Sequence, residues 1–406
     1  MQYRGDNLMS VKRTNRSAAM RILHRSGAMS RKRLAENMGL TPAAITKIVG
    51  EMIAEGLLSE GEMLQTGGAG RREILIDLNP DAGIALGVLI NTGQVLLSAV
   101  RLDGQVLFSE EITIAPQADA DRLLPHIVSR LTELTEQNRI DEEKIIGLGI
   151  AVRGICSADG ELVVNSFGAL QQENYPLRAR LEKATGFHCV MANNVRALFA
   201  AEMFFSREED GGSQFFLRCE YGIGAALSIE GKIWHGVTEQ CAEIGHIPVI
   251  RRGGKPCSCG KSGCLETIAS PGAIREDALA VLSPTETPNL WKIKEKKGRE
   301  ELSLSDIFSA AQNGDAAVGE IVDRAAEALA SALKSVIYLV DPGRIVLYGR
   351  MFDEPYYLSR LIAEMQEGVD SGHAVEVKKS AWNQQLEKKA AGLVAVEEFF
   401  NQGGIR

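Results

Sequence analysis

Residues 255–266 read KPCSCGKSGCLE and place three cysteines, Cys257, Cys259 and Cys264, within eight positions. The other four cysteines are scattered, and an odd total of seven argues against a disulfide framework. Closely spaced thiolates are instead typical of a metal site, because a tight turn can bring several of them to one ion. The cluster therefore predicts a bound metal, with free thiols as the alternative.

The rest of the chain is typical of a globular protein with about two or three domains. It has 406 residues, 45% hydrophobic and 24% charged, so each domain can bury a core. The longest apolar helix candidate, at 327–340, is interrupted by Lys334, and the N-terminus lacks the apolar core of a signal peptide. We therefore expect a cytoplasmic protein without membrane insertion.

Charge is divided unevenly along the chain. The net charge is −8, yet residues 1–50 contain ten Lys and Arg against two acidic residues, which is +8 and leaves −16 for the other 356. A basic head on an acidic body predicts that only the head contacts a polyanion. A solvated basic surface is the alternative.

The basic segment has the pattern of a helix-turn-helix. A first helix is predicted over 10–25. A second follows Ser30, a good N-cap, and ends at Gly39. A third begins with Thr41 as N-cap and Pro42 at its first position. Two helices joined by a short turn within a basic segment are typical of DNA-binding domains.

The third helix has a buried face and an outward face. Its apolar residues recur at helical spacing: Ile45, Ile48, Val49, Met52 and Ile53. The outward positions at its N-terminal end are Thr41, Ala43, Ala44, Thr46 and Lys47. Short and hydroxyl-bearing side chains let a helix lie deep in the major groove, where its first turns reach base edges. We therefore predict that these residues contact operator DNA.

A β-hairpin is predicted after the third helix. Its strands are 57–62 and 74–78, joined by QTGGAGRR, which has three glycines and ends in Arg71 and Arg72. Such a tip suits phosphates or a narrow minor groove. The whole predicts a winged helix-turn-helix domain over residues 1–80, with a small helical dimerisation module as the alternative.

The body shows one strand plan twice. Three successive strands are expected within 82–112, then a helix at 119–138 and an apolar strand at 144–152. Three further strands within 213–236 begin the plan again, and a long helix, a strand, a loop and a buried strand follow late in the chain. A meander followed by helix–strand alternation, present twice, predicts two α/β lobes around a cleft.

Two motifs identify a family. AEIGHIPV at 242–249 and CSCGKSGCLETIAS at 257–270 resemble the ROK family of repressors, open reading frames and sugar kinases, and with the winged head the chain resembles its repressor branch. The resemblance implies a bilobal, actin-like (RNase H-like ATPase-type) α/β body. We expect a first lobe of 81–192 with 381–406, and a second of 193–380 that holds the metal site and an oligomerisation surface.

The metal site needs a fourth ligand, and His246 lies eleven residues before Cys257. Three thiolates and one imidazole suit Zn²⁺, and four protein ligands leave no open position for catalysis. We therefore expect a structural zinc held by His246, Cys257, Cys259 and Cys264.

The resemblance also implies a sugar pocket. In the family, a Glu and a His of the first motif and the Glu of CLE bind sugar hydroxyls, and a carboxylate can accept two donors at once. The expected sugar-binding residues are Asn193, Asn194, Glu243, His246 and Glu266, with Asn165 as a weaker candidate. Solvated helix charges are the alternative for the two glutamates.

Departures from the family's kinases argue against catalysis. Where those kinases have an Asp as general base, this chain has Asn194, and a carboxamide cannot take up a proton at neutral pH. Leu89 replaces the acid of the first phosphate loop, and Asn91 and Thr92 replace its paired glycines. No catalytic residue is therefore predicted, and the chain is not expected to be an enzyme.

Further departures affect the second phosphate loop and the sugar pocket. Glu220 and Tyr221 stand where small residues are expected, and an acid there would repel a triphosphate. Arg153 replaces the family's usual Pro, and Ala242 its usual Gly, so the pocket is expected to be reshaped.

These patterns together predict a sugar-responsive transcriptional regulator, a repressor of carbohydrate metabolism genes that has lost kinase activity. Its expected partners are operator DNA, a sugar or sugar derivative and further copies of itself, as a homodimer or homotetramer. Two alternatives stay open: a divergent ATP-dependent sugar kinase with a DNA-binding head, and a repressor controlled by a protein partner.

Overall fold

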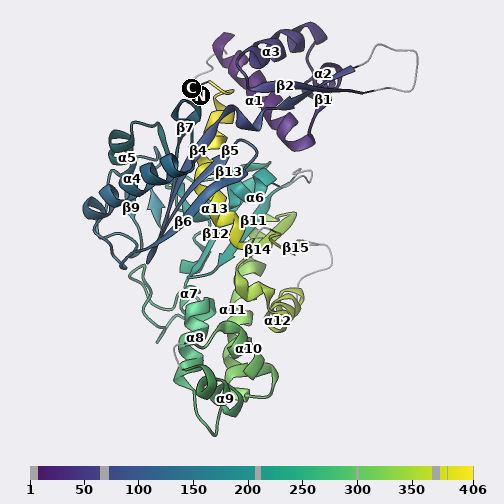
Figure 1. The fold of residues 1–406 in the computed structure, drawn as a ribbon. Coiled ribbons are helices and arrows are strands. Elements are labelled where there is room, and N and C mark those ends of the chain that lie inside the picture. The colour runs from purple at the N-terminus through teal and green to yellow at the C-terminus, as the bar shows by residue number, and fades with distance from the viewer. Residues whose placement is uncertain are drawn as a thin grey trace. The chain divides into compact units, whose positions relative to one another are not determined.

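The computed structural model describes residues 8–64, 73–205, 212–298, 301–367, 375–381 and 383–405. The chain forms two compact units, Met1–Glu208 with Gln384–Arg406, and Glu209–Asn383. The two units are each described on their own below (Figure 1). Among the helices in the described ranges, none is long and apolar enough to cross a membrane.

The first unit begins with a three-helix head and a small sheet. Its elements are α1 (Leu8–Ser26), β1 (Met29–Ser30), α2 (Arg31–Met38), α3 (Pro42–Ala54), β2 (Leu58–Leu64) and β3 (Glu73–Leu78). The strands pair antiparallel in the order β1-β3-β2. The Ser30 hydroxyl accepts from the Arg33 amide at 3.4 Å, and Gly39 closes α2 with a left-handed φ of 62°. This is the winged helix-turn-helix that the sequence predicts.

The head packs around one side of α3. Ile45, Val49 and Met52 are fully buried, whereas Ile48 and Ile53 lie at the margin of the predicted stripe and are half-buried. The Thr41 hydroxyl accepts from the Ala44 amide at 3.3 Å, so the N-terminal turn of α3 is fixed by its cap.

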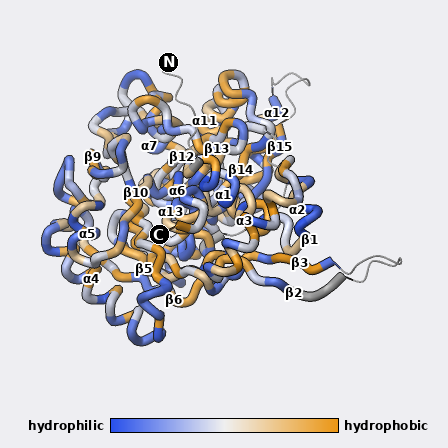
Figure 2. The backbone as a smooth tube through the Cα atoms, turned by 90° about the horizontal axis from the view of Figure 1, so that it is seen from above, coloured by the Kyte–Doolittle hydropathy of each residue, from blue (hydrophilic) through white to orange (hydrophobic). Residues whose placement is uncertain are grey.

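The rest of the first unit is a five-stranded sheet with helices. Its strands are β4 (Ile84–Asn91), β5 (Gln94–Arg101), β6 (Val106–Thr113), β7 (Ile145–Val152) and β10 (Cys189–Asn193), in the order β10-β7-β4-β5-β6. Its helices are α4 (Ala120–Gln137), α5 (Leu177–Thr185), α6 (Asn194–Phe205) and α13 (Asn383–Asn401), and β8 (Ile155–Cys156) pairs with β9 (Val163–Asn165). In Figure 2 its strands are mostly orange, whereas α4 and α5 include blue segments.

The second unit repeats this plan. Its sheet has the order β13-β12-β11-β14-β15, from β11 (Gln214–Cys219), β12 (Ile223–Ile229), β13 (Lys232–Trp234), β14 (Arg344–Tyr348) and β15 (Glu376–Lys379). Its helices are α7 (Glu266–Ala269), α8 (Pro271–Ala280), α9 (Pro288–Lys297), α10 (Leu304–Gln312), α11 (Ala316–Val340) and α12 (Pro355–Gln366). In both units an antiparallel meander is followed by two strands that pair parallel to its first strand or to each other. The duplicated, actin-like α/β fold is confirmed.

The units divide at different residues from those expected. Helix α6 lies in the first unit, although the second lobe was expected to begin at residue 193. The helix contacts β4, β7 and β10 of the first unit's sheet, and its residues from Asn194 to Glu202 are buried. The buried strand expected late in the chain is β15, an edge strand whose end residues are exposed.

Helix α13 packs so closely against the first unit's sheet that no side chain fits between the two backbones at two strand positions. A Cβ atom on Gly149 would lie 1.8 Å from the Ala391 carbonyl oxygen, and one on Gly87 would lie 2.6 Å from the Gly392 nitrogen. Real side chains do not approach backbone so closely, so glycine is required at both strand positions. The contact places a helix from the C-terminus over β4 and β7.

Gly149→Ala should therefore destabilise the first unit by about 2–4 kcal/mol, because the new methyl group must displace α13 or the strand. Urea unfolding followed by circular dichroism would measure this. Gly50→Ala is the matched control, since Gly50 lies inside α3 with nothing within 4 Å of the added Cβ. That variant should gain about 0.5–1 kcal/mol. Equal stability of both variants would contradict the packing account.

Candidate metal centre, effector residues and DNA-facing helix

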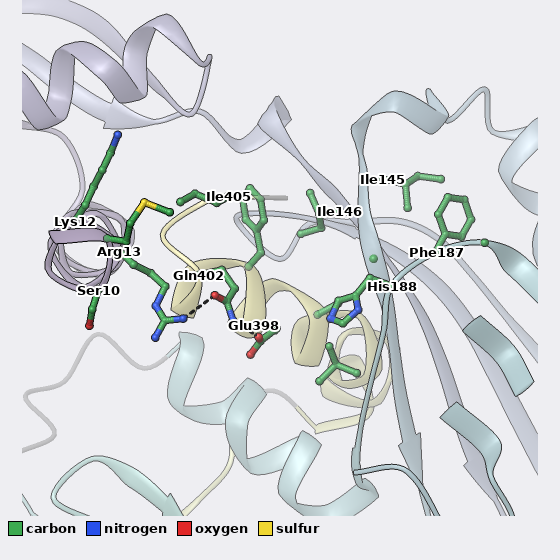
Figure 3. A pocket seen from close by; sticks show the side chains of 16 residues that line it. Ser10, Lys12, Arg13, Ile145, Ile146, Phe187, His188, Glu398, Gln402 and Ile405 are labelled. Atoms are coloured by element: carbon green, nitrogen blue, oxygen red, sulfur yellow. Dashed lines mark hydrogen bonds between the residues drawn. The ribbon is translucent and has the colours of Figure 1, made fainter. Parts of the chain in front are cut away.

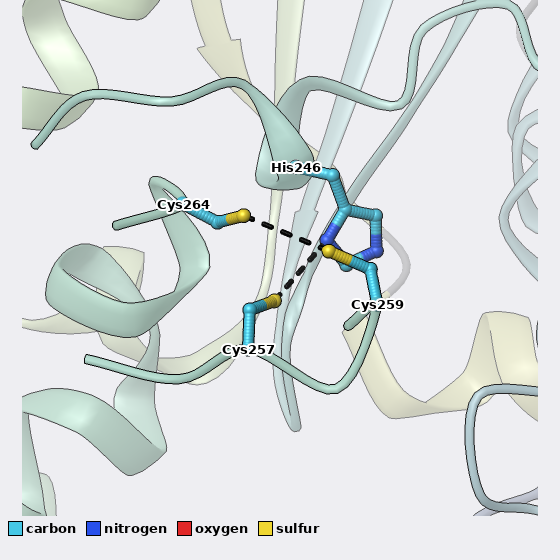
Figure 4. A group of neighbouring side chains, drawn as sticks. All are labelled: His246, Cys257, Cys259 and Cys264. Atoms are coloured by element: carbon cyan, nitrogen blue, oxygen red, sulfur yellow. Dashed lines mark hydrogen bonds between the residues drawn. The ribbon is translucent and has the colours of Figure 1, made fainter. Parts of the chain in front are cut away.

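A cluster of one histidine and three cysteines lies in the second unit (Figure 4). The ligand atoms of His246, Cys257, Cys259 and Cys264 all lie within 4.8 Å of one another. The Cys257 Sγ is 3.5 Å from the His246 Nδ1, and the Sγ atoms of Cys259 and Cys264 are 3.7 Å apart. A tetrahedral ion with metal–sulfur bonds near 2.3 Å requires sulfur separations of about 3.8 Å. The donor set therefore fits a four-coordinate metal.

A tight loop brings the three thiols together. The Cys257 amide donates to the Lys261 carbonyl oxygen at 2.8 Å, and the Gly263 amide donates to the Lys255 carbonyl oxygen at 2.9 Å. Gly263 has a φ of +74°, and a Cβ there would lie 2.0 Å from the Ile250 oxygen. The loop is thus closed by its own backbone and by a position that only glycine can occupy.

The cluster's thiols differ in acidity. Burial, with the neighbouring Cys259 and Cys257, raises the pKa of Cys264 to about 12. Burial also opposes ionisation of Cys259, but the Lys261 amide and the neighbouring thiols outweigh it and lower the pKa of Cys259. Of these two thiols, Cys259 therefore loses its proton more readily, which prepares one thiolate for a cation.

Glu266 is held beside the metal loop. One of its carboxylate oxygens accepts from the Ile223 amide at 2.9 Å, and the other lies 3.5 Å from the Ser258 hydroxyl. A Cβ on Gly222 would lie 2.1 Å from the Glu266 Oε2, so the glycine makes room for the carboxylate. Sequence reasoning missed the Ile223 and Ser258 contacts, because backbone donors and loop neighbours leave no residue-type signal.

Glu243 and His246 come from one short turn. The turn is a 3₁₀ helix, Ile244–His246, and Glu243 immediately precedes it. A Cβ on Gly245 would lie 2.1 Å from the Ile223 carbonyl oxygen, so the turn and Glu266 both contact residue 223. Ala242, where the family usually has glycine, keeps a left-handed φ of 65°, which costs a residue with a Cβ about 1–3 kcal/mol.

Asn193 and Asn194 lie at the carboxyl end of β10 in the first unit. The Asn193 side-chain oxygen accepts from the amides of Val195 at 2.9 Å and Arg196 at 3.1 Å, and its Nδ2 donates to the Gly154 oxygen at 2.7 Å. Asn193 is therefore the N-cap of α6, a structural role that the sequence reading did not assign.

The replaced kinase positions contact one another. The Asn194 Nδ2 donates to the Asn91 Oδ1 at 2.8 Å, and both residues are buried. Close by on the same edge, the Arg153 guanidinium donates to the Thr92 hydroxyl at 2.9 Å. Amide and guanidinium groups therefore contact one another at the positions where the kinases have a carboxylate base and paired glycines.

Two other candidate positions have local partners. The Asn165 Nδ2 donates to Glu173 at 2.9 Å, and its oxygen accepts from the Phe167 amide at 2.7 Å. Glu220, which was expected to repel phosphate, accepts from the Arg350 amide at 2.8 Å and lies 3.6 Å from the Arg350 Nε. Its charge is therefore compensated within the second unit.

The predicted DNA-facing residues occupy the free side of α3. Thr41, Ala43, Thr46 and Lys47 are exposed, and Ala44 is half-buried. Thr46 donates its hydroxyl to the Pro42 carbonyl oxygen at 2.8 Å. Arg71 and Arg72 lie outside the described residues.

The chain has a winged helix-turn-helix head on a duplicated actin-like body with a His/Cys₃ cluster. Asn194 stands where the kinases have their general base. These features define a class: DNA-binding proteins built on a sugar-kinase fold. The ROK family profile matches residues 85–395, and this chain belongs to the ROK family, in the repressor branch with the winged head.

Several relatives and solved structures are similar to this chain. The DNA-binding transcriptional dual regulator NagC of Escherichia coli (strain K12) is 27% identical over 345 residues, which are 85% of this chain and 82% of that protein. A glucokinase of Halalkalibacterium halodurans is 27% identical over 264 residues, 65% of this chain and 79% of that protein. A solved ROK family transcriptional regulator, a homolog of the E. coli MLC protein, has a TM-score of 0.80 at 24% identity, covering 97% of this chain and 98% of that one.

The cap assignment makes a specific prediction. Asn193→Ala should destabilise the first unit by about 1–2 kcal/mol, because two amides of α6 and the Gly154 carbonyl lose their partner. Asn193→Asp keeps the oxygen that caps α6 but places a carboxylate oxygen against the Gly154 carbonyl oxygen, so it should recover only part of that loss. Thermal unfolding of the two variants measures the difference. If Asn193→Ala is as stable as the parent, the cap does not support the helix.

Proposed function

We propose that this chain is a DNA-binding transcriptional regulator of carbohydrate metabolism genes, a repressor whose affinity for operator DNA responds to a bound sugar. The observation that carries the proposal is the exposed, capped N-terminal turn of α3 within a basic head. Thr41, Ala43, Ala44, Thr46 and Lys47 would contact base edges and phosphates, and Arg71 with Arg72 would contact the backbone or the minor groove.

The body is proposed to be a sugar receptor without kinase activity. The position of the general base holds Asn194, and a carboxamide cannot accept a proton at neutral pH. The Asn194 amide donates to Asn91 instead. Asn193, Asn194, Glu243, His246 and Glu266 would provide the polar surface for sugar hydroxyls, as donors and acceptors of hydrogen bonds. Binding can shift DNA affinity only as far as the sugar prefers one conformation.

We also propose that the His/Cys₃ cluster holds a structural Zn²⁺ with four protein ligands. Such an ion cross-links the turn of Glu243 and His246 to the loop that precedes Glu266. The proposed sugar residues of the second unit would then depend on the metal for their position. A symmetric homodimer or homotetramer would present two heads to a palindromic operator.

Lys47→Ala should weaken binding to operator DNA and lower the slope of log affinity against log salt by about 1, because one phosphate contact is lost. Fluorescence anisotropy at several salt concentrations measures both quantities. Lys144→Ala is the control, an exposed lysine of the first unit outside the head, and should leave both unchanged. Identical salt slopes and affinities for Lys47→Ala and the parent would contradict the proposed phosphate contact of Lys47.

Cys259→Ser should reduce bound zinc from about one ion per chain to almost none and lower the free energy of unfolding of the second unit by about 4 kcal/mol. Elemental analysis and thermal unfolding measure the two effects. Cys241→Ser, outside the cluster, should retain the ion. Full zinc content in Cys259→Ser would refute the proposed ligand set.

A further inference from the structure

The C-terminal end of α13 and the residues after it pack against the DNA-binding head. Arg16 of α1 is 1% exposed. Its Nε donates to the Gly403 carbonyl oxygen at 2.7 Å, and its Nη1 donates to a Glu55 carboxylate oxygen at 2.8 Å. Its other terminal nitrogen pairs with the second Glu55 oxygen. One buried guanidinium thus joins α1, the end of α3 and residues 402–405, which are called the C-terminal segment below.

The shape of the C-terminal segment matches this contact. Gly403 and Gly404 have φ values of +68° and +75°, which favour glycine. A Cβ on Gly404 would lie 2.6 Å from the Leu57 Cδ1, and one on Gly403 would lie 2.9 Å from the Arg13 oxygen. The segment therefore reaches the head only because it lacks side chains at these two positions.

Weaker contacts surround the Arg16 pair. Arg13 donates to the Gln402 Oε1 at 3.1 Å (Figure 3), and Arg21 donates to the Asn401 Oδ1 at 2.9 Å. Beside them lies a cavity of about 1030 Å³, lined by α1, by β7 and by the end of α13. The cavity interrupts packing between head and lobe on this side, while elsewhere His24 of α1 stacks on Phe204 of α6 with ring centroids 3.9 Å apart.

Helix α13 connects this junction to the rest of the body. The chain leaves the second unit at Asn383, where α13 begins, and its 19 residues span about 28 Å before the C-terminal segment. Near its middle, around Ala391 and Gly392, the helix lies so close to the first unit's sheet that Gly87 and Gly149 have no room for a side chain. Helix α13 therefore joins the sheet of the first unit to the residues after the helix, where Gly403 accepts from Arg16.

We propose that Arg16 is a positioning residue for DNA recognition: through Gly403 and Glu55 it latches the head to α13, so that the lobe sets the direction in which α3 meets DNA. This inference rests on the proposed function. Arg16 need not contact DNA. Its effect is on the geometry with which two heads of an oligomer address two half-sites.

Arg16→Met tests the latch, since methionine keeps much of the side-chain length and loses every donor. Hydrogen exchange should become at least about 10-fold faster at the amides of residues 403 and 404, which close the last turn of the C-terminal segment. Affinity for a single half-site selected from random DNA should change less than about 2-fold. Discrimination between the full operator and one with five base pairs inserted should fall at least about 10-fold.

Two further variants separate latching from general damage to the fold. Gly404→Ala breaks the same contact from the other side, leaves the Arg16–Glu55 pair intact and should reproduce both effects. Arg130→Met removes a comparable bidentate pair, in which Arg130 donates to Glu110 at 2.6 Å from two nitrogens, on the lobe helix α4. That control should keep the parent's exchange rates at the C-terminus and its operator discrimination.

The outcomes distinguish the latch from the proposed function. Parental exchange rates in both Arg16→Met and Gly404→Ala would overturn the latch, even if the protein binds its operator. Faster exchange with unchanged discrimination between spacings would reduce Arg16 to a structural residue and also overturn the proposal. If the parent protein selects no DNA, the proposed function fails, and with it the positioning role of Arg16.

Discussion

Close packing of α13 on the first unit's sheet is the constraint on which the rest of that unit depends. Gly87 and Gly149 allow the helix to approach at backbone distance. The same helix carries the C-terminal segment to the head, where Arg16 binds Gly403. A larger residue at either strand position would displace α13, and the residues that follow the helix and bind Arg16 would be displaced with it.

Much of this architecture could be predicted from the sequence. The caps Ser30 and Thr41 mark helix starts by local chemistry, and the strand plan is visible in apolar runs. The placement of α6 in the first unit could not be predicted, since its apolar residues fit either lobe. The Arg16 latch was also invisible, because its partners are 39 and 387 residues away.

The candidate sites, too, could be predicted from the sequence only in part. Cysteine spacing predicted a cluster whose four ligand atoms do converge, because closely spaced thiols in one loop have few other places to lie. For Asn193 the sequence suggested a ligand contact, which stays a prediction, and the structure adds a helix cap. An asparagine before a helix can either bind a ligand or cap the helix, and the sequence does not distinguish the two. The hydrogen bonds of its Oδ1 and Nδ2 atoms identify the cap. The Asn91–Asn194 pair likewise joins positions 103 residues apart.

The most direct test of the central claim is binding of the purified protein to DNA upstream of its own and neighbouring genes. Anisotropy would be followed at near-physiological salt, with and without each member of a sugar panel. We predict tight binding to one fragment, at least about 1000-fold tighter than to unrelated DNA, that one sugar shifts severalfold. Weak, salt-sensitive binding of similar strength to every fragment, unchanged by any sugar, would contradict the account.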